Sequence, residues 1–440
     1  MRIAVVTWSR RKVGGTEAYL ESIIPELLNA GHQVAFWHEV DVPVANSQIA
    51  LSREIPTWCA AELGSQTALA ALREWRPDVI YDHSLMSPAL EAEMPQVAPV
   101  VFFAHAYYGT CISGAKTFKT PTTTPCHRRF GWQCLLNYYP HRCGGLNPLT
   151  MLKEYKRQSD RLNLLSRYRA IVTHSNHMRN EYLKHGFDPQ HVSNLSYYAK
   201  QPGVTFDLNE EKGLLNNSTT TPEAPLTAPE DEKSDPLKPP CWRLLFLGRM
   251  DFLKGGHLFI DALPLVSAAL KRPLEITFAG EGPQRKAWER RAARAQKRNP
   301  DVRIKFTGWV SGSKRESLWN DCDLLVVPSV WPEPFGLVGP EAGLHGVPIA
   351  AFAVGGITDW LSSGVNGYLA DGDPPTSSGL AEAIIKCCCD PEIHAHLRRG
   401  AQAMAHRFNM KNHLTRLLDV FEKVLEPTGA SEVEGGYQIA

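Results

Sequence analysis

The sequence predicts an α/β protein with two doubly wound, Rossmann-like parallel sheets that face each other across a central cleft. In both halves, short apolar runs alternate with amphipathic stretches of helical length. Runs that are apolar on both faces are typical of parallel strands covered by helices. The alternation stops near residue 200, resumes after 240, and extends over 440 residues, too many for one ordinary core.

The first lobe is predicted to span residues 1–199. Its expected strands are Ile3–Trp8, Val34–His38, Asp78–Asp82, Val100–His105, Ala170–His174 and Val192–Tyr197. The stretch Thr16–Ala30 has the apolar spacing of a helix and is followed by Gly31, a residue that commonly ends helices. Residues 107–145 break the pattern, which predicts a loop-rich insert containing several Cys and His residues.

Residues 200–240 contain many Pro, Ser, Thr and acidic residues and have no apolar period, so we expect a disordered linker there. The second lobe is predicted to span 241–405. Its expected strands are Arg243–Leu247, Leu274–Ala279, Val302–Thr307, Leu324–Val327 and Pro348–Phe352, and its expected helices are Gly255–Ala269, Gln284–Arg298, Arg315–Asn320 and Leu337–His345. Helical residues 406–426 and a flexible tail, 427–440, complete the chain.

Charge balance, the N-terminal sequence and cysteine positions limit the class of protein and its location. Lys and Arg total 47 and Asp and Glu total 46, a balance that argues against a nucleic-acid binder relying on net positive charge. The N-terminus does not resemble a signal peptide, and no stretch of about 20 apolar residues is evident that would span a bilayer. Adjacent Cys387, Cys388 and Cys389 suit reduced thiols. A cytoplasmic location is therefore expected.

Two glycine-containing turns at strand ends suit anions. Gly14 and Gly15 precede the first helix, where free backbone amides favour a negative charge, although such a pair also forms simple tight turns. In the second lobe, Arg249 and Lys254 lie on the turn between the first strand and its helix. A guanidinium and an ammonium there suit a pyrophosphate, and the alternative is two solvated surface cations.

The segment 328–342 is the most informative. Glu333 and Glu341 lie on either side of a strand-to-helix turn whose amides, at Phe335, Gly336 and Leu337, are expected to point toward a bound anion. Carboxylates in these positions suit ribose and sugar hydroxyls. Asp321-Cys322-Asp323 spells a metal–nucleotide motif of other transferases, but it precedes a strand, away from the expected cleft, and we interpret it as structural.

These segments resemble the family 4 glycosyltransferases, which have the GT-B fold. The resemblance covers both lobes and rests on the motifs named above, together with Gly280-Glu281-Gly282-Pro283, Thr307-Gly308-Trp309-Val310 and Gly355-Gly356-Ile357-Thr358-Asp359. It implies transfer of a sugar from a UDP- or GDP-sugar with retention of anomeric configuration, no required cofactor or catalytic metal, and a last helix that crosses back onto the first lobe.

The resemblance also implies roles for single residues. Arg249 and Lys254 would neutralise the diphosphate, while Glu341 would bind the ribose. Glu333 would hold the donor sugar with Phe335, Gly336 and Leu337 around it, Val310 would contact the base, and His105 would lie near the anomeric carbon, with Gly14 and Gly15 also on the donor. The sequence departs from the family pattern at Ala106, where Asp is frequent, at Asp359, where Glu is common, and in its long linker.

The insert carries Cys111, Cys126, Cys134 and Cys143, with His127 and His141 nearby. Four thiols and two imidazoles in a loop-rich module suit a structural zinc. No C-x-x-C pair is present, and the alternative is buried reduced cysteines with at most one disulfide. Because the insert directly follows His105, it is expected to line the acceptor side of the cleft.

The acceptor is not readable from the sequence: a glycan such as a cell-envelope polysaccharide, a lipid-linked sugar and a small molecule all fit. The basic stretch 147–169 suits peripheral contact with the inner face of a membrane, and a solvated helix is the alternative. Other hypotheses for the whole chain are a non-catalytic nucleotide-sugar-binding protein, or a GT-B phosphorylase or epimerase.

Overall fold

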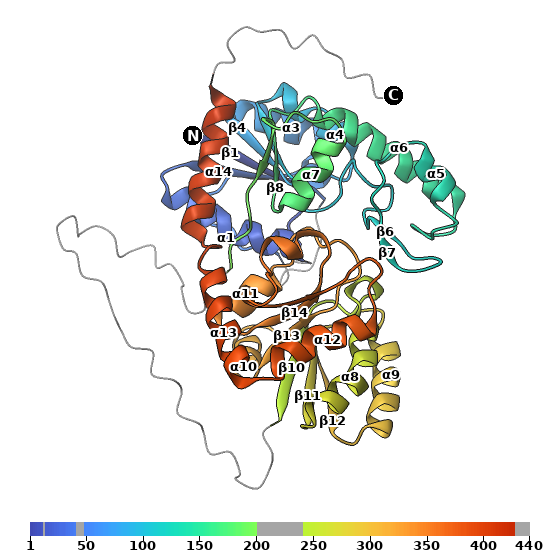
Figure 1. The fold of residues 1–440 in the computed structure, drawn as a ribbon. Helices are drawn as coiled ribbons and strands as arrows, with labels where there is room; N and C mark the ends of the chain where they lie inside the picture. The colour runs from blue at the N-terminus through green and yellow to red at the C-terminus, as the bar shows by residue number, and fades with distance from the viewer. Residues whose placement is uncertain (12–13, 41–47, 200–240, 427–440) are drawn as a thin grey trace, which may run out of the picture.

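The computed structural model describes residues 1–11, 14–40, 48–199 and 241–426, and these form two lobes, each built around one large parallel sheet (Figure 1). The predicted linker, 200–240, and the predicted tail, 427–440, lie outside the described residues. The predicted two-sheet α/β architecture is confirmed.

In the first lobe, seven parallel strands are ordered β3-β2-β1-β4-β5-β8-β9. Their bounds are β1 Arg2–Ser9, β2 Gln33–Val40, β3 Thr57–Cys59, β4 Val79–Asp82, β5 Val100–Phe103, β8 Ala170–Thr173 and β9 Val192–Asn194. The helices are α1 Gly15–Asn29, α2 Ala60–Leu63, α3 Ser65–Trp75, α4 Pro88–Glu91, the 3-10 turn η2 Met94–Gln96, α6 Pro148–Leu165 and α7 Asn176–Lys184. The sequence did not predict β3, whose three residues are too short for a periodic signal.

In the second lobe, six parallel strands are ordered β12-β11-β10-β13-β14-β15. Their bounds are β10 Trp242–Leu247, β11 Leu274–Ala279, β12 Val302–Gly308, β13 Leu324–Val327, β14 Ile349–Phe352 and β15 Gly367–Ala370. The helices are η3 Phe252–Lys254, α8 Gly256–Leu270, α9 Arg285–Arg298, α10 Ser313–Asn320, α11 Val338–Leu344, η4 Gly355–Asp359, α12 Ser377–Cys388 and α13 Pro391–Ala405. The edge strand β15 was also not predicted.

The last described helix, α14 (Met410–Leu425), leaves the second lobe and packs against the first, where Figure 1 draws it in red. Its Phe421 is fully buried, with its ring 5.2 Å from that of Tyr81 on β4. Its His413 is hydrogen-bonded to the Tyr19 hydroxyl on α1 at 2.8 Å. The return to the first lobe therefore agrees with what the resemblance implied.

By length and composition, the helical stretch Phe252–Leu270 could cross a membrane, contrary to the expectation that no stretch qualifies. Within the fold, however, α8 is a core helix. Phe259, Ile260 and Leu263 are at most 1% exposed and belong to the hydrophobic core of the second lobe. Its apolar composition is accounted for by this packing.

The insert contains the two-stranded antiparallel ribbon of β6 (Thr117–Phe118) and β7 (Thr124–Pro125), followed by the short helix α5 (Gln133–Asn137). A buried ion pair attaches it to the first lobe: Lys116 Nζ lies 2.5 Å from a carboxylate oxygen of Glu181 on α7. Ile112, Phe130, Tyr138 and Leu162 form a small hydrophobic cluster between the insert and α6. The insert therefore has a core of its own.

The structural zinc stays a prediction. Among the described residues, which include all ten cysteines, none is in a disulfide, and no group of three or more His, Cys, Asp or Glu side chains is arranged to hold a metal ion. The thiol of Cys143 lies 3.8 Å from the Asn137 carbonyl oxygen, and burial raises its pKa to about 12. The neighbouring thiols of Cys111, Cys126 and Cys134 add to this rise, so the four insert cysteines lie close enough to interact.

Candidate active site

The centre of the candidate site is a buried carboxylate paired with a lysine. Glu333 lies in the loop after β13, and its side chain is only 5% exposed. Lys254, from the turn before α8, places Nζ 2.5 Å from Glu333 Oε1, and the Ser329 hydroxyl also donates to that oxygen at 2.5 Å. Two residues far apart in the sequence are thus brought together, a contact that was not predicted, and each neutralises the charge of the other.

The Gly355-Gly356 motif lies in the loop after β14, where both glycines contact the backbone of Glu333. The Gly356 amide donates to the Glu333 carbonyl at 2.7 Å. A Cβ added at Gly355, which has φ +58°, would lie 2.3 Å from that same carbonyl oxygen. Only a residue without a side chain permits this approach, so the glycine pair fixes the backbone that carries Glu333.

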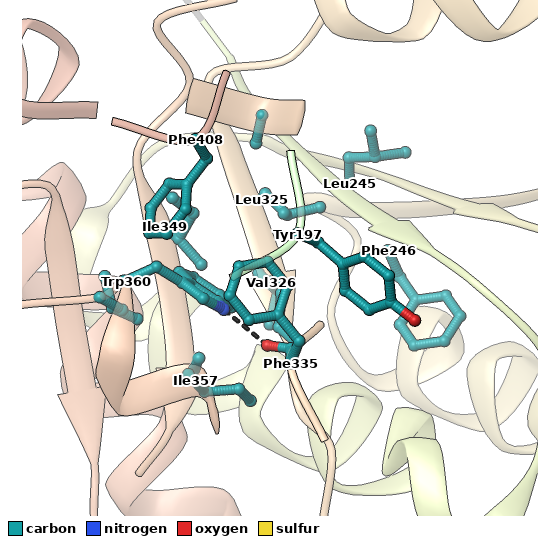
Figure 2. Packing of buried hydrophobic residues seen from close by; sticks show 14 of the residues in the cluster. Tyr197, Leu245, Phe246, Leu325, Val326, Phe335, Ile349, Ile357, Trp360 and Phe408 are labelled. Atoms are coloured by element: carbon teal, nitrogen blue, oxygen red, sulfur yellow. Dashed lines mark hydrogen bonds between the residues drawn. The ribbon is translucent and has the colours of Figure 1, made fainter. Parts of the chain in front are cut away.

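Phe335 is held by packing that involves both lobes (Figure 2). Trp360 Nε1 donates to its carbonyl at 2.6 Å, drawn as the dashed line. The Phe335 ring lies 5.7 Å from the ring of Tyr197 in the first lobe and 5.5 Å from that of Phe408. The turn from Phe335 to Leu337 is therefore rigidly placed before α11 begins at Val338.

His105 lies two residues beyond the end of β5. Its Nε2 is 2.7 Å from Nδ1 of His83, and its Nδ1 is hydrogen-bonded to the Tyr197 hydroxyl. Burial, with smaller contributions from His83 and His174, holds the pKa of His105 well below its ordinary value. The imidazole is therefore neutral, and a sugar hydroxyl that reaches it must replace one of these two partners.

Direct contacts join the first lobe to the Glu333 loop. The hydroxyl of Tyr107 donates to the Pro332 carbonyl at 2.6 Å, and the Ser175 hydroxyl donates to the Pro334 carbonyl at 2.5 Å. A Cβ added at Gly15 would lie 4.0 Å from Cδ1 of Leu337. The Gly14-Gly15 loop thus faces the start of α11 across the cleft.

The remaining predicted donor residues follow strands of the same sheet. Arg249 follows β10 and is exposed. Glu341 in α11 is hydrogen-bonded to Arg315 of α10; burial raises its pKa, and Arg315 partly opposes the rise. Val310 follows β12 and packs partly buried against the second-lobe core. Each lies just past a carboxyl strand end or on the helix that follows, where such folds bind ligands.

The Asp321-Cys322-Asp323 motif lies at the opposite end of the second sheet. The Asp323 carboxylate accepts from the Arg243 backbone amide at 2.8 Å and pairs with the Arg243 guanidinium, which also lies 3.6 Å from Asp321. The motif joins the amino ends of β10 and β13, which agrees with its structural interpretation.

Two neighbouring cavities adjoin the site on the insert side. The larger, of about 730 Å³, is lined by Lys119, Tyr138, Glu154, Arg157 and the 251–253 turn before Lys254. The smaller, of about 220 Å³, shares Glu154 and Arg157 with it and extends to Ala106, next to His105. Both have polar and aromatic lining, as ligand sites do. We call them the insert cavities.

Several residues of the site were not predicted. His83, which contacts His105, directly follows β4, and its position after a strand end was the available signal. Tyr197 lay within a predicted strand but follows the observed end of β9. Arg315 and Ser329 have no local signature, because their importance comes from the carboxylates they contact.

Comparison with known proteins agrees with this architecture. Residues 13–194 match the family described as Glycosyltransferase Family 4, and residues 242–390 match that described as Glycosyl transferases group 1. An uncharacterized glycosyltransferase of Methanocaldococcus jannaschii is 24% identical over 98% of this chain and 100% of its own length. The D-inositol 3-phosphate glycosyltransferase of Salinispora tropica is 32% identical, over 40% of this chain and 37% of its own.

Solved structures share the fold. Anabaena HepE in complex with UDP-glucose superposes with a TM-score of 0.63 at 21% identity, covering 96% of this chain and all of that one. Sucrose-phosphate synthase of Thermosynechococcus elongatus superposes with a TM-score of 0.63 at 18% identity, covering 96% and 98%. The chain is therefore a glycosyltransferase of the GT-B fold, with a Glycosyltransferase Family 4 domain in its first lobe and a group 1 domain in its second.

Proposed function

We propose that the protein transfers a hexose-type sugar from a UDP- or GDP-sugar to a hydroxylated acceptor, with retention of anomeric configuration. The observation that supports this most is the pairing of Lys254 with the buried carboxylate of Glu333, in the loop that leads into α11. An incoming diphosphate attracts Lys254, which frees the Glu333 carboxylate to accept hydrogen bonds from the sugar hydroxyls.

The chemistry follows from where charge develops. As the bond between the anomeric carbon and the diphosphate breaks, negative charge accumulates on the leaving oxygen. Lys254, Arg249 and the amides at the start of α11 stabilise that charge more in the transition state than in the ground state. The neutral His105 contacts the sugar without adding a repelling positive charge. No metal enters this scheme, which instead relies on the two cations.

The acceptor is placed in the insert cavities. They adjoin both Ala106 and the 251–253 turn, so an acceptor bound there approaches the anomeric carbon from the first-lobe side. The lining offers Tyr138 as a stacking surface, with Glu154 and Arg157 as hydrogen-bonding groups. A glycan, a lipid-linked sugar and a small metabolite all remain candidates, and the cytoplasmic location stays a prediction.

Release of nucleoside diphosphate from a panel of UDP- and GDP-sugars tests the proposal, with the product anomer assigned by NMR. Glu333→Gln should lower turnover by about 10²-fold or more while nucleotide affinity is kept. The matched control Glu289→Gln, on the exposed face of α9, should behave as wild type. Nucleotide binding without turnover, for every donor and acceptor tried, would instead favour a non-catalytic binding protein.

A second variant separates the acceptor side from the donor side. Ser113 lines both insert cavities, so Ser113→Trp should fill them and suppress transfer to an acceptor. Slow hydrolysis of the donor by water should persist, because Lys254 and Glu333 are unchanged. Equal loss of both reactions would place the acceptor elsewhere.

A further inference from the structure

A second buried histidine contacts the His105 imidazole. His83 directly follows β4, is only 2% exposed, and places its Nδ1 2.7 Å from Nε2 of His105. The two rings are stacked, with centroids 5.0 Å apart and planes 29° from parallel. Burial lowers the pKa of His83 to about 3. His83 is therefore a neutral imidazole, as His105 is, and the contact between them is a hydrogen bond without net charge.

The backbone that carries His83 is held in an uncommon conformation. Ser84, the next residue, has φ +78° and is 3% exposed. A residue with a side chain keeps such a conformation only where its surroundings impose it. The Ser84 amide donates to Asp82 Oδ1 at 2.8 Å, and the Leu85 amide donates to Glu91 Oε1 at 2.8 Å. Arg161 of α6 pairs with Glu91 at 3.1 Å and donates to the Leu85 carbonyl. Buried charged side chains thus fix the turn that places His83 against His105.

His83, His105 and Tyr197 form one hydrogen-bonded chain. Burial raises the pKa of Tyr197 well above its ordinary value, so this side chain is a neutral hydroxyl. Each neutral imidazole has one N–H, and the chain can therefore run in two directions. In the first direction, the hydroxyl donates to Nδ1 of His105, and Nε2–H of His105 donates to Nδ1 of His83. In the second direction, each donor becomes an acceptor.

The ends of the chain favour the first direction. Nε2 of His83 is buried and has no hydrogen-bond partner among the residues that the structure describes. In the first direction, this nitrogen carries the one unpaired proton of the chain. In the second, it is an unpaired acceptor, and the Tyr197 proton is unpaired as well, because the hydroxyl contacts no other acceptor in the described part of the chain. Each unpaired buried polar atom costs free energy, so the direction with fewer of them is preferred.

The two partners of His105 lie on different sides of it. The ring of Tyr197 is 5.7 Å from that of Phe335, in the loop that leads into α11. The ring of His83 instead lies 4.2 Å from that of Tyr81 on β4, within the first lobe. A ligand that approaches from the second lobe therefore meets the Tyr197 side of His105 and leaves the His83 side in place.

We propose that His83 is a positioning residue that holds His105 as the Nε2–H tautomer, so that Nδ1 of His105 is offered as an acceptor to a hydroxyl of the donor sugar. The sugar hydroxyl takes the place of the Tyr197 hydroxyl at Nδ1. The partner of one ring nitrogen decides the tautomer of an imidazole, and hence what its other nitrogen can bind. The contact with the sugar rests on the proposed function, whereas the tautomer does not.

Long-range ¹H–¹⁵N correlation spectra of the histidine rings in the nucleotide-free full chain test the tautomer without an activity measurement. The His105 signals are assigned by their loss in His105→Gln. Wild type should show Nε2–H at His105. His83→Asn, whose side-chain carbonyl can accept in place of Nδ1, should keep that tautomer. His83→Leu, which cannot accept, should shift His105 toward Nδ1–H. An Nδ1–H tautomer in wild type, or an unchanged tautomer in a folded His83→Leu, would overturn the proposal.

Kinetics test the consequence for turnover. With a donor that wild type uses, His83→Leu should lower kcat by about tenfold or more, while the Kd of the nucleoside diphosphate changes by less than about twofold. His83→Asn should recover most of the loss. The control His394→Leu removes another partly buried imidazole, bonded to the Cys387 carbonyl in the second lobe, and should turn over as wild type does.

The outcomes separate this proposal from the proposed function. Full turnover in His83→Leu, or an equal loss in His83→Asn and His83→Leu, refutes the positioning role. An Nε2–H tautomer that depends on His83, in a wild type that turns over no donor, supports the His83 contact and refutes the proposed function instead.

Discussion

At the scale of single residues, the Lys254–Glu333 pair has two functions that a substitution can separate. It stabilises the empty site by compensating a carboxylate that is only 5% exposed, and it supplies the cation for the diphosphate. A buried charge that loses its partner is costly, whereas removing both charges is often close to neutral. Stability and nucleotide affinity should therefore respond differently to single and double variants.

Lys254→Met should lower the free energy of unfolding by roughly 1–3 kcal/mol, because it leaves the Glu333 carboxylate without its cation. It should also weaken nucleoside diphosphate binding. The double variant Lys254→Met/Glu333→Gln should recover most of the stability but none of the affinity. Chemical denaturation and calorimetric titration measure the two. Arg73→Met, which breaks an exposed pair with Glu93, is the control and should change stability by less than about 1 kcal/mol.

His413 makes the stability depend on pH. Burial lowers its pKa to about 4, although the hydrogen bond to the Ser196 carbonyl opposes the shift. Below the ordinary pKa of 6.5, the unfolded chain binds a proton that the folded chain excludes. The stabilising contribution is complete above pH 6.5 and is lost as pH falls toward 4.

His413→Gln should therefore be less stable than wild type at pH 7.5, by about 1 kcal/mol for the altered hydrogen bonds. At pH 5 the wild type alone has lost on the order of 2 kcal/mol through His413, so the gap should close or reverse. Urea denaturation of both proteins at the two pH values provides the comparison. If the difference in unfolding free energy between the two proteins stays constant with pH, the His413 imidazole is not held neutral by burial.

At the scale of elements, the turn from β10 into α8 depends on Gly255. This residue has φ +68° and caps α8, and a Cβ placed there would lie 1.7 Å from the Pro328 carbonyl oxygen. Gly312, which caps α10, has φ +54° but open space around its missing Cβ. Both glycines have a positive φ, but Gly255 is in the left-handed helical region (ψ 12°) and Gly312 is not (ψ −138°), and only Gly255 has a close neighbour at its missing Cβ.

Gly312→Ala should cost roughly 1–3 kcal/mol, the strain of an alanine held in a backbone region that glycine alone adopts readily. Gly255→Ala should cost clearly more and should also reduce nucleotide affinity, because the turn carrying Lys254 must move away from the β13 loop. Thermal unfolding and nucleotide titration of the two variants check this. Equal effects would mean that backbone strain alone, without the contact to Pro328, determines the turn.

At the scale of the whole molecule, α14 couples the end of the chain to the first lobe. Phe421 is fully buried there, while Leu425, one turn further along, is 37% exposed. Phe421→Ala should destabilise the protein by about 3–5 kcal/mol, and Leu425→Ala should cost much less. In the Phe421→Ala variant, amide hydrogen exchange should accelerate first in α1 and β4, not in the second lobe. Exchange that accelerates equally in both lobes would contradict this local role.

The alternation of apolar runs predicted both sheets because a buried parallel strand has to be apolar on both faces, a property that local sequence carries. Most strands were predicted to within a few residues. The exceptions, β3 and β15, are edge strands whose residues are only partly buried, so they lack the continuous apolar run of a central strand. The structural zinc stays a prediction, because the spacing of four cysteines in the sequence does not by itself give the arrangement of their thiols.

The sequence by itself predicted which lobe carries the candidate phosphate-binding turns and which glutamates belong to the candidate site, since Arg249, Lys254, Glu333 and Glu341 all follow strands of one sheet or lie in the helix after one. Only the tertiary structure decided that Lys254 pairs with Glu333 and that His83 and Tyr197 engage His105. It also decided which residues meet where α14 packs on the first lobe: Tyr19 and His413 are 394 residues apart. Such contacts depend on sheet order and on how the two lobes pack, and neither of these produces a repeating pattern of residues in the sequence.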